Sequence, residues 1–318
     1  MARDFSIVKI EDEADASKEN FSIPRPGIHP SASSVEFYHQ GERVVEGYCL
    51  RQIWYKNMMR FFGAKLLKKD ISINFARAGK LGKWIERGIL EDWAKAGILI
   101  DNNIKFYDHK YQMSGEMDAI IRSKETGLLT GVEIKTFAGY AAEKLLFGVS
   151  RERGSNKRMA GRPRDYQFLQ SCIYAWKYRN RFDNFRLYYH SREYGKRCEF
   201  EITFEKRDDN RHTCCWEQVK GGDFKVLDDG PVRMPYAIED VYDRSVKLLG
   251  YINKKELPPR DYQEECSPER VSALYDLDKV SFAKHRDWEK DPEKNKIQDK
   301  ACEYCDFREQ CMMDDLTF

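Results

Sequence analysis

Residues 131–136 read GVEIKT, and this short stretch decides the fold of the chain. In a β-strand, residues two positions apart point to the same side. Glu133 and Lys135 therefore project together, while Val132 and Ile134 point to the opposite side. An isolated Glu-x-Lys pair on a strand is most often an ion pair on a solvated edge. The flanking sequence has to decide between that interpretation and a functional one.

Upstream of this strand, SGEMDAII at residues 114–121 carries Asp118 in a strand-like run. A turn separates the two strands, so we expect a hairpin that places Asp118 beside Glu133. Two converging carboxylates repel unless a cation lies between them, and Mg²⁺ prefers hard oxygen ligands. Lys135 beside such an ion would orient or deprotonate a water, or stabilise developing charge on phosphate. This is the chemistry of phosphodiester hydrolysis, although a surface hairpin with mixed charges explains the spacing equally well.

Composition bounds the class of protein. Hydrophobic residues make up 41% of the 318 residues, enough for a substantial core, and 55 basic against 53 acidic residues give a net charge of +2. This small net charge does not by itself indicate nucleic-acid binding, so any basic surface must be local. The sequence contains no run of about 18 apolar residues, which a membrane-spanning helix would need. The N-terminus turns acidic where a signal peptide needs an apolar core, so we expect a cytoplasmic protein without a membrane partner.

Alternating helix and strand patterns predict an α/β fold with a mixed central sheet flanked by helices. Residues 1–30 are acidic and then proline-rich, which indicates an N-terminal arm. The main domain is expected at 31–265 and a C-terminal tail at 266–318, while 205–235 have no assigned role. Residues 31–59 open with serines suited to capping and predict helical segments. Further helices are expected at residues 80–98, 165–179 and 237–256, and strands at 104–123, 128–137, 184–191 and 198–205.

These motifs resemble a known family. GEMD, followed by VEIK with its glutamate fifteen residues after the aspartate, is similar to the core of PD-(D/E)xK nucleases. The first motif is relaxed to Gly115-x-x-Asp118, as in the RecB-like branch. That branch also carries a Q-x3-Y motif on the following helix, matched here by Gln170 and Tyr174, which share one helical face. The resemblance implies a restriction-endonuclease-like core.

The resemblance also implies roles for the matched residues. Asp118 and Glu133 would hold Mg²⁺ or Mn²⁺ together with the backbone carbonyl of Ile134, and Lys135 would assist the attacking water. Gln170 and Tyr174 would position the DNA or the lysine.

Family members usually place one more metal ligand on the helix before the first strand. Within the helix expected at 80–98, Glu86 lies inside the apolar arc, and a buried carboxylate needs a partner such as a metal. Many iron–sulfur members have histidine here and this helix has none, so Lys83 competes with Glu86 for the position. The apolar arc is formed by residues at helical spacing: Leu81, Trp84, Ile85, Ile89 and Trp93.

The C-terminal CEYCDFREQC contains Cys302, Cys305 and Cys311 at C-x2-C-x5-C spacing. A disulfide framework is not expected in a reducing compartment, and thiolates suit either zinc or an iron–sulfur cluster. Three cysteines lack a fourth ligand, for which Cys49 is the candidate and Cys266 the competitor.

One early and three late cysteines resemble the iron–sulfur subgroup of RecB-like nucleases. That subgroup includes the CRISPR adaptation nuclease (the fourth Cas protein) and the nuclease module of helicase–nucleases such as AddB. The resemblance implies a structural [4Fe–4S] cluster that joins the two ends of the domain through Cys49, Cys302, Cys305 and Cys311.

A glycine-rich basic loop at 151–164 separates the Glu-x-Lys strand from the helix of Gln170, so we expect it at the rim of the site. Its charge suits contact with a phosphate backbone, although charge runs are usually solvated. The candidate DNA-binding residues are Arg151, Arg153, Lys157, Arg158, Arg162 and Arg164.

The resemblance implies a metal-dependent deoxyribonuclease, best described as an exonuclease on single strands or DNA ends, in recombination, repair, replication or CRISPR adaptation. The chain has no G-x4-G-K-[ST] motif, so unwinding would come from a partner helicase. A recombinase, CRISPR adaptation proteins or a second copy of the chain are further expected partners, and a phage-encoded version would act in the host cytoplasm. Two alternatives remain open: a DNA-binding assembly subunit with little cleavage, and a zinc-stabilised DNA-binding protein.

Overall fold

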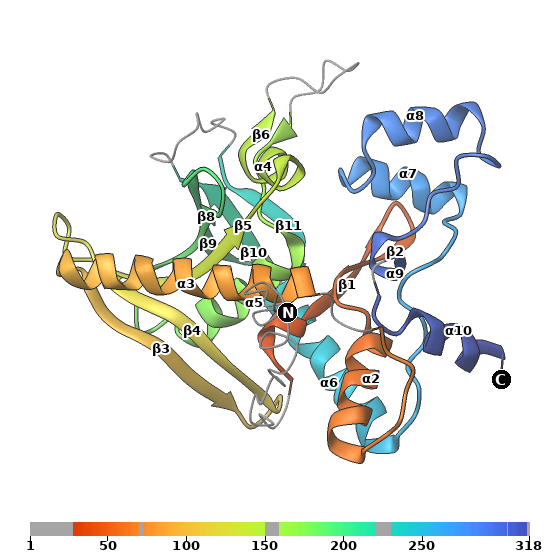
Figure 1. Ribbon diagram of the computed structural model, residues 1–318, viewed down its shortest axis with the longest axis horizontal. Helices are drawn as coiled ribbons and strands as arrows, with labels where there is room; N and C mark the ends of the chain where they lie inside the picture. Colours follow the sequence, from red (N-terminus) through yellow and green to blue (C-terminus); the bar gives the residue numbers. More distant parts are fainter. Residues whose placement is uncertain (1–27, 70–72, 150–158, 220–229, 304, 317–318) are drawn as a thin grey trace, which may run out of the picture.

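A computed structural model describes residues 28–69, 73–149, 159–219, 230–303 and 305–316 (Figure 1). The architecture is mixed α/β, with a large, mostly antiparallel central sheet flanked by helices. The expected α/β class and central sheet are confirmed. Almost all of the N-terminal arm expected at 1–30 lies outside the described residues.

Among the described residues the central sheet has seven strands, and β5 and β8 are the only two of these strands that pair with each other in parallel. The last two strands of the chain, β10 and β11, fall mostly within the region for which the sequence indicates no role, and they extend one edge of the sheet. The spatial order is β11 (Val232–Ala237), β10 (His212–Gln218), β9 (Arg197–Lys206), β8 (Asn184–Ser191), β5 (Leu129–Phe137), β4 (Met113–Arg122) and β3 (Leu99–Asp108).

Two helices cover opposite faces of β5. Helix α3 (Ile73–Lys95) packs Leu90 against Val132 and Ile134, whereas helix α5 (Asp165–Lys177) reaches Glu133 from the other side. Figure 1 shows α3 crossing in front of the sheet and α5 behind it. Since strand side chains alternate between faces, this arrangement confirms the alternation expected for residues 131–136.

The apolar arc expected along α3 is only partly buried. Leu90 is buried and packs beside Ile89 and Trp93, but Leu81 is 41% exposed and Trp84 is 59% exposed. The expectation of a continuous buried face is therefore wrong for the first half of the helix. Among the described side chains of α3, Leu90 in its C-terminal half is the only large apolar one that is buried.

Residues 31–59 are not helical throughout, which corrects the expectation from the serines. Strands β1 (Ser34–His39) and β2 (Glu42–Gly47) form a hairpin before helix α2 (Leu50–Phe62). Gln40 and Gly41 have φ of 51° and 82°, the backbone that a two-residue hairpin turn of the primed type needs. Alternating β-branched and aromatic residues favour this hairpin more than the serines favour a helix.

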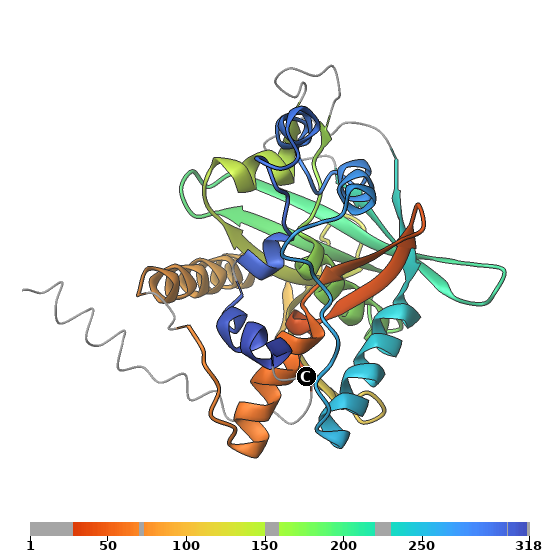
Figure 2. The same ribbon diagram turned by 90° about the vertical axis from the view of Figure 1, so that its right-hand side faces the viewer.

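The remaining elements lie around the sheet, and Figure 2 shows the helix of residues 308–316 beside α2. No helix among the described residues is both long and apolar enough to cross a membrane. The other elements are η1 (Pro30–Ala32), α4 (Tyr140–Phe147), β6 (Gly148–Val149), β7 (Met159–Ala160), α6 (Ile238–Lys254), α7 (Pro268–Asp276), α8 (Phe282–Lys290), α9 (Lys300–Glu303) and α10 (Arg308–Leu316).

Buried charges join the C-terminal part to the core. Lys279 Nζ lies 2.9 Å from Glu46 Oε1 on β2 and 2.7 Å from Asp165 Oδ2 at the start of α5. The Tyr236 hydroxyl donates to Glu46 Oε2 at 3.0 Å. Buried ion pairs contribute little net stability, but losing one partner leaves a charge without compensation. The segment after α7 is therefore bonded to the helix that carries Gln170.

Candidate functional site

The candidate site lies where β4 and β5 separate. Their antiparallel register runs from Ala119–Val132 to Arg122–Leu129 and stops at Asp118. At that position Asp118 Oδ2 accepts the backbone N–H of Ile134 at 2.6 Å. The expected hairpin thus brings Asp118 beside the Glu-x-Lys strand, with its carboxylate taking the place of a ladder bond. The predicted role of the Ile134 carbonyl as a metal ligand stays a prediction.

Glu133 and Lys135 form the centre of the site. Lys135 Nζ donates to Glu133 Oε1 at 2.6 Å, and the side chain of Glu133 is 1% exposed against 21% for Lys135. Glu133 Oε2 is buried and has no hydrogen-bond partner among the described residues. A buried carboxylate oxygen without a partner is costly. The second oxygen of Glu133 is therefore the position in this site that most needs a cation.

Helix α5 orients this carboxylate. Gln170 Nε2 donates to Glu133 Oε1 at 2.8 Å and lies 3.2 Å from the Tyr174 hydroxyl. Both side chains are buried, and they share a helical face because they are four residues apart. The Gln-x3-Tyr pair expected from sequence is thus placed against Glu133, with its two polar groups in contact.

Gly115 makes room for Tyr174. A β-carbon at Gly115 would lie 2.6 Å from a ring carbon of Phe106 and 2.8 Å from a ring carbon of Tyr174. The two rings meet edge to face with centroids 5.7 Å apart. No larger residue fits without displacing one ring, which gives the glycine of the Gly-x-x-Asp motif a packing reason.

Two further acidic residues lie near Asp118. Burial, followed by the charge of Asp118, raises the pKa of Glu86 to about 7, which places Glu86 of α3 within the electrostatic reach of the site. Close approach of α3 is possible at Gly82, where a β-carbon would lie 2.9 Å from Thr136 Oγ1. Burial raises the pKa of Asp118, and the charge of Glu116 adds to this shift. Sequence analysis missed Glu116, although its two-residue spacing from Asp118 on one strand could have indicated it.

The carboxyl groups in the site retain protons more strongly than usual. Burial, and then the charge of Asp118, raises the pKa of Glu133 to about 8. Burial also raises the pKa of Asp118. Burial alone would lower the pKa of Lys135, but the charges of Glu133 and Asp118 outweigh it and raise that pKa. Lys135 is therefore a fixed positive charge. A metal ion would bind the carboxyl groups of Asp118 and Glu133 in competition with protons.

The donor set fits a hard divalent ion. Within the described ranges, no group of three or more His, Cys, Asp or Glu side chains is arranged as a complete metal site. Mg²⁺ commonly uses one or two carboxylates and keeps several waters, so it does not require three protein ligands. The unpartnered Oε2 of Glu133 beside Asp118 supplies that donor set.

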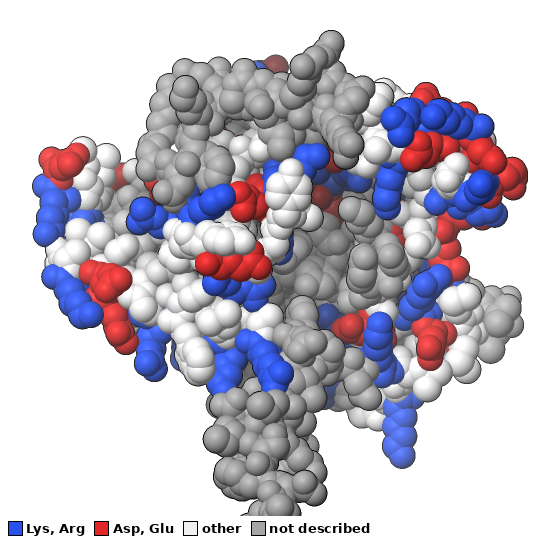
Figure 3. Space-filling view, turned by 45° about the horizontal axis from the view of Figure 1, so that its top comes forward, with Lys and Arg blue, Asp and Glu red and all other residues white. Residues whose placement is uncertain are grey.

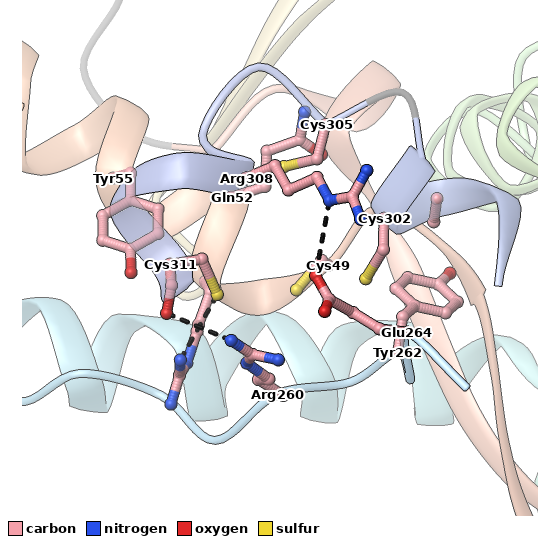
Figure 4. A pocket seen from close by; sticks show the side chains of 12 residues that line it. Cys49, Gln52, Tyr55, Arg260, Tyr262, Glu264, Cys302, Cys305, Arg308 and Cys311 are labelled. Carbon is pink, nitrogen blue, oxygen red and sulfur yellow. Dashed lines mark hydrogen bonds and ion pairs between the residues drawn. The ribbon is translucent and has the colours of Figure 1, made fainter. Parts of the chain in front are cut away.

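The four predicted cluster cysteines line one cavity (Figure 4). Cys49 immediately precedes α2, Cys302 lies in α9, and Cys311 lies in α10. Cys266 packs instead with Val271 and Ile297 and does not line this cavity. The structure therefore brings Cys49, rather than its competitor Cys266, to the three late cysteines.

The lining of this cavity suits thiolate ligands. Burial and then the charge of Asp261 raise the pKa of the Cys49 thiol to about 12, so the thiol is neutral without a bound cation. Arg51 Nη1 donates to Cys311 Sγ at 3.3 Å, and Arg260 and Arg308 also line the cavity. These guanidinium groups would offset thiolate charge. In a four-iron cluster each thiolate binds a separate iron, which fits four thiols spread around one cavity.

The basic loop is only partly described. The Arg162 guanidinium donates to the carbonyls of Leu277 at 3.2 Å and Asp278 at 3.0 Å, so it holds the turn after α7. The Arg164 amide donates to the Tyr189 hydroxyl at 3.2 Å. Figure 3 shows Lys and Arg interspersed with Asp and Glu on the face it views. The other predicted DNA contacts lie outside the described residues: Arg151, Arg153, Lys157 and Arg158.

No protein-family model, curated protein or solved structure matches this chain. The functional inference is therefore drawn from the residues of the chain and their geometry.

Proposed function

We propose that this protein is a divalent-metal-dependent deoxyribonuclease that hydrolyses phosphodiester bonds, acting as an exonuclease on single-stranded DNA or DNA ends. The observation that carries the proposal is the buried Oε2 of Glu133, which has no hydrogen-bond partner among the described residues, in a carboxylate whose Oε1 pairs with Lys135 and whose pKa is raised by burial and then by the charge of Asp118. A carboxylate pair with one lysine supplies both a site for a hard cation and a positive charge for phosphate.

Each residue has a distinct role in this proposal. Asp118 and Glu133 hold Mg²⁺ or Mn²⁺, with Glu86 as a further acidic group, and the bound ion supplies Lewis acidity and a more acidic water. Lys135 stays protonated because two carboxylates raise its pKa. It therefore acts as a donor to phosphate or to the attacking water rather than as a base.

Helix α5 provides positioning. The bond from Gln170 to Glu133 Oε1 fixes the carboxylate so that Oε2 is left for the ion. Tyr174 in turn supports Gln170 and is held by the ring of Phe106. A preorganised carboxylate does not have to reorient during the reaction, which favours catalysis.

We further propose that the cysteine cavity holds a [4Fe–4S] cluster with a structural role. The cavity joins the start of α2 to the α9–α10 region, and these two parts of the chain are far apart in sequence. The protein would then act in a reducing cytoplasm, with a helicase, recombinase or CRISPR adaptation proteins as partners.

The test is an anaerobic cleavage assay on single-stranded oligonucleotides labelled at either end, with Mg²⁺, Mn²⁺ or chelator. Wild type should cleave only with metal, and Asp118→Asn should lower the rate by about 10²–10³-fold or more. Asp101→Asn is the matched control, because Asp101 is an exposed aspartate on the neighbouring strand β3.

Cleavage that survives Asp118→Asn would contradict the assignment of this site. The other informative outcome is a folded wild type that binds DNA and yet cleaves neither single strands, nor duplexes, nor ends with metal present. That result would favour the assembly-subunit alternative.

A further inference from the structure

Two exposed tyrosines lie on neighbouring segments that follow β5 and β8. Tyr140 is 77% exposed and Tyr194 is 72% exposed, the highest values among the large hydrophobic and aromatic side chains of the described residues. The N–H of Gly139, next to Tyr140, donates to Glu193 Oε2 at 3.1 Å, next to Tyr194. Two segments distant in sequence thus place one exposed tyrosine each next to this bond.

Both tyrosines stand on a fixed backbone. Ser191 Oγ accepts the N–H groups of Glu193 and Tyr194, each at 3.2 Å. Tyr140 is the first residue of α4, and Gly139 before it has φ of 83°, which turns the chain sharply from β5 into that helix. Exposed rings on a rigid backbone bind with little loss of conformational entropy.

The tyrosines follow the strands that build the site. Lys135 and Tyr189 are register partners in the parallel pair β5–β8. Beyond them the Arg192 N–H donates to the Phe137 carbonyl at 2.8 Å, and Tyr140 and Tyr194 come directly after this bond. Ligands of open α/β sheets bind outside the carboxyl ends of such strands. Tyr140 and Tyr194 therefore follow the carboxyl ends of β5 and β8, on the C-terminal side of Lys135.

Basic side chains lie near the rings, together with the acidic groups Glu143 and Glu193. Lys196 Nζ lies 5.7 Å from the centroid of the Tyr194 ring and also pairs with Glu143 of α4. The Arg192 guanidinium donates to the Ala78 carbonyl of α3 at 2.9 Å. Exposed aromatic rings beside Lys and Arg are the combination by which proteins bind single-stranded nucleic acid without reading its sequence.

We propose that Tyr140 and Tyr194 form a stacking platform for unpaired bases and thereby make single-stranded DNA the preferred substrate. The inference rests on the proposed function for the position of the scissile phosphate at Asp118 and Glu133. Bases of a duplex are already stacked on one another, so only an unpaired strand offers free base faces to the rings.

The test measures binding to a labelled oligo(dT) by full-length protein in chelator, so that no cleavage occurs. Tyr140→Ala and Tyr194→Ala should each weaken binding about tenfold, whereas Tyr140→Phe and Tyr194→Phe should stay within about twofold because the ring is kept. Tyr38→Ala is the matched control, a 69% exposed tyrosine on β1, and it should bind like wild type.

An abasic strand of the same length separates stacking from backbone contact. On that strand the alanine variants should bind as tightly as wild type, because no base is left to stack. Equal losses on both strands, no loss on oligo(dT), or no binding of oligo(dT) by wild type would each overturn the platform. The assay is independent of cleavage: the predicted binding pattern in a protein that fails the cleavage test would support the platform and refute the nuclease.

Discussion

The carboxylate site and the cysteine cavity assemble their ligands in opposite ways. Asp118, Glu133, Gln170 and Tyr174 come from two paired strands and the helix that follows them. The cysteine cavity instead draws Cys49 from one part of the chain and three thiols from its last seventeen residues. One site is local and the other joins distant segments, so loss of a metal should affect the two differently.

Packing explains the difference. Phe168, Leu169, Ile173 and Tyr174 of α5 belong to the main hydrophobic core, so α5 stays in place whether or not a cation is bound. Among the described side chains from α9 to α10, Phe307 alone is buried, and its ring meets the Tyr55 ring of α2 with centroids 5.3 Å apart. We therefore expect the cysteine site to control stability and the carboxylate site to control chemistry.

The largest effect on stability is expected from Cys305→Ser. Losing one of four ligands should bleach the visible absorption of an anaerobically purified protein. It should also lower the melting temperature by roughly 10 °C or more, since binding energy at a structural metal site is folding energy. The measurement is absorption together with thermal unfolding. Cys266→Ala is the control and should keep the colour, because Cys266 does not line the cavity. A coloured, equally stable Cys305→Ser would break the contrast between the two sites.

Lys279→Met tests the link between the tail and α5. The substitution leaves the carboxylates of Glu46 and Asp165 without their shared cation, which should lower the free energy of unfolding by about 3–5 kcal/mol. Denaturant unfolding measures it. Lys247→Met is the control: its side chain is 46% exposed and 3.8 Å from Glu36, so the cost should stay below about 1 kcal/mol. Similar costs for the two variants would show that the buried pairs do not join the tail to the core.

Gly115→Ala sharpens the account of the carboxylate site. The added methyl group would meet the rings of Phe106 and Tyr174, so we expect a loss of about 1–3 kcal/mol in unfolding free energy and a lower cleavage rate. Gly88→Ala is the control, because a β-carbon at Gly88 in α3 meets nothing within 4 Å. That control should be neutral or stabilising, since alanine favours helix more than glycine does. If Gly115→Ala is equally harmless, the glycine has no packing role.

The last prediction concerns the pH dependence of metal-free stability. The pKa of Glu133 is raised from about 4.5 to about 8, so between those values the folded state binds more protons than the unfolded state. Stability from this group is therefore full at low pH and falls as pH rises through that window. Thermal unfolding across pH 5 to 8.5 should show the decline, and Mg²⁺ should offset it. Glu133→Gln should make the decline shallower and leave the part due to Glu86 and Asp118, whose pKa values are also raised. A decline of the same slope in Glu133→Gln would assign it to other groups.

Local sequence patterns predict most of the geometry of the carboxylate site. The two-residue spacing of Glu133 and Lys135, the hairpin that brings Asp118 to them, and the four-residue spacing of Gln170 and Tyr174 all follow from strand and helix periodicity, and the geometry agrees with each. These relations depend on neighbours in the chain, which is why sequence alone predicts them.

Long-range contacts account for what the sequence did not predict. Arg162, expected to bind DNA, is held by carbonyls more than a hundred residues away, and Lys279 bonds to two carboxylates at similar or greater separation. Periodicity gives no information about such pairs. The hairpin of β1 and β2 was mispredicted for a local reason instead. Serines at the start of a strand resemble helix caps, and the Gln40–Gly41 turn was not recognised.

We propose a divalent-ion site around Glu133 where β4 and β5 separate, and a Mn²⁺ titration by calorimetry at pH 7 tests for it. Because the pKa of Glu133 is about 8, wild type should bind Mn²⁺ and release protons. Glu133→Gln should bind at least tenfold more weakly and release fewer protons. Glu125→Gln, at an exposed glutamate in the β4–β5 turn, should match wild type. Equal Mn²⁺ affinity and equal proton release in Glu133→Gln would contradict the claim.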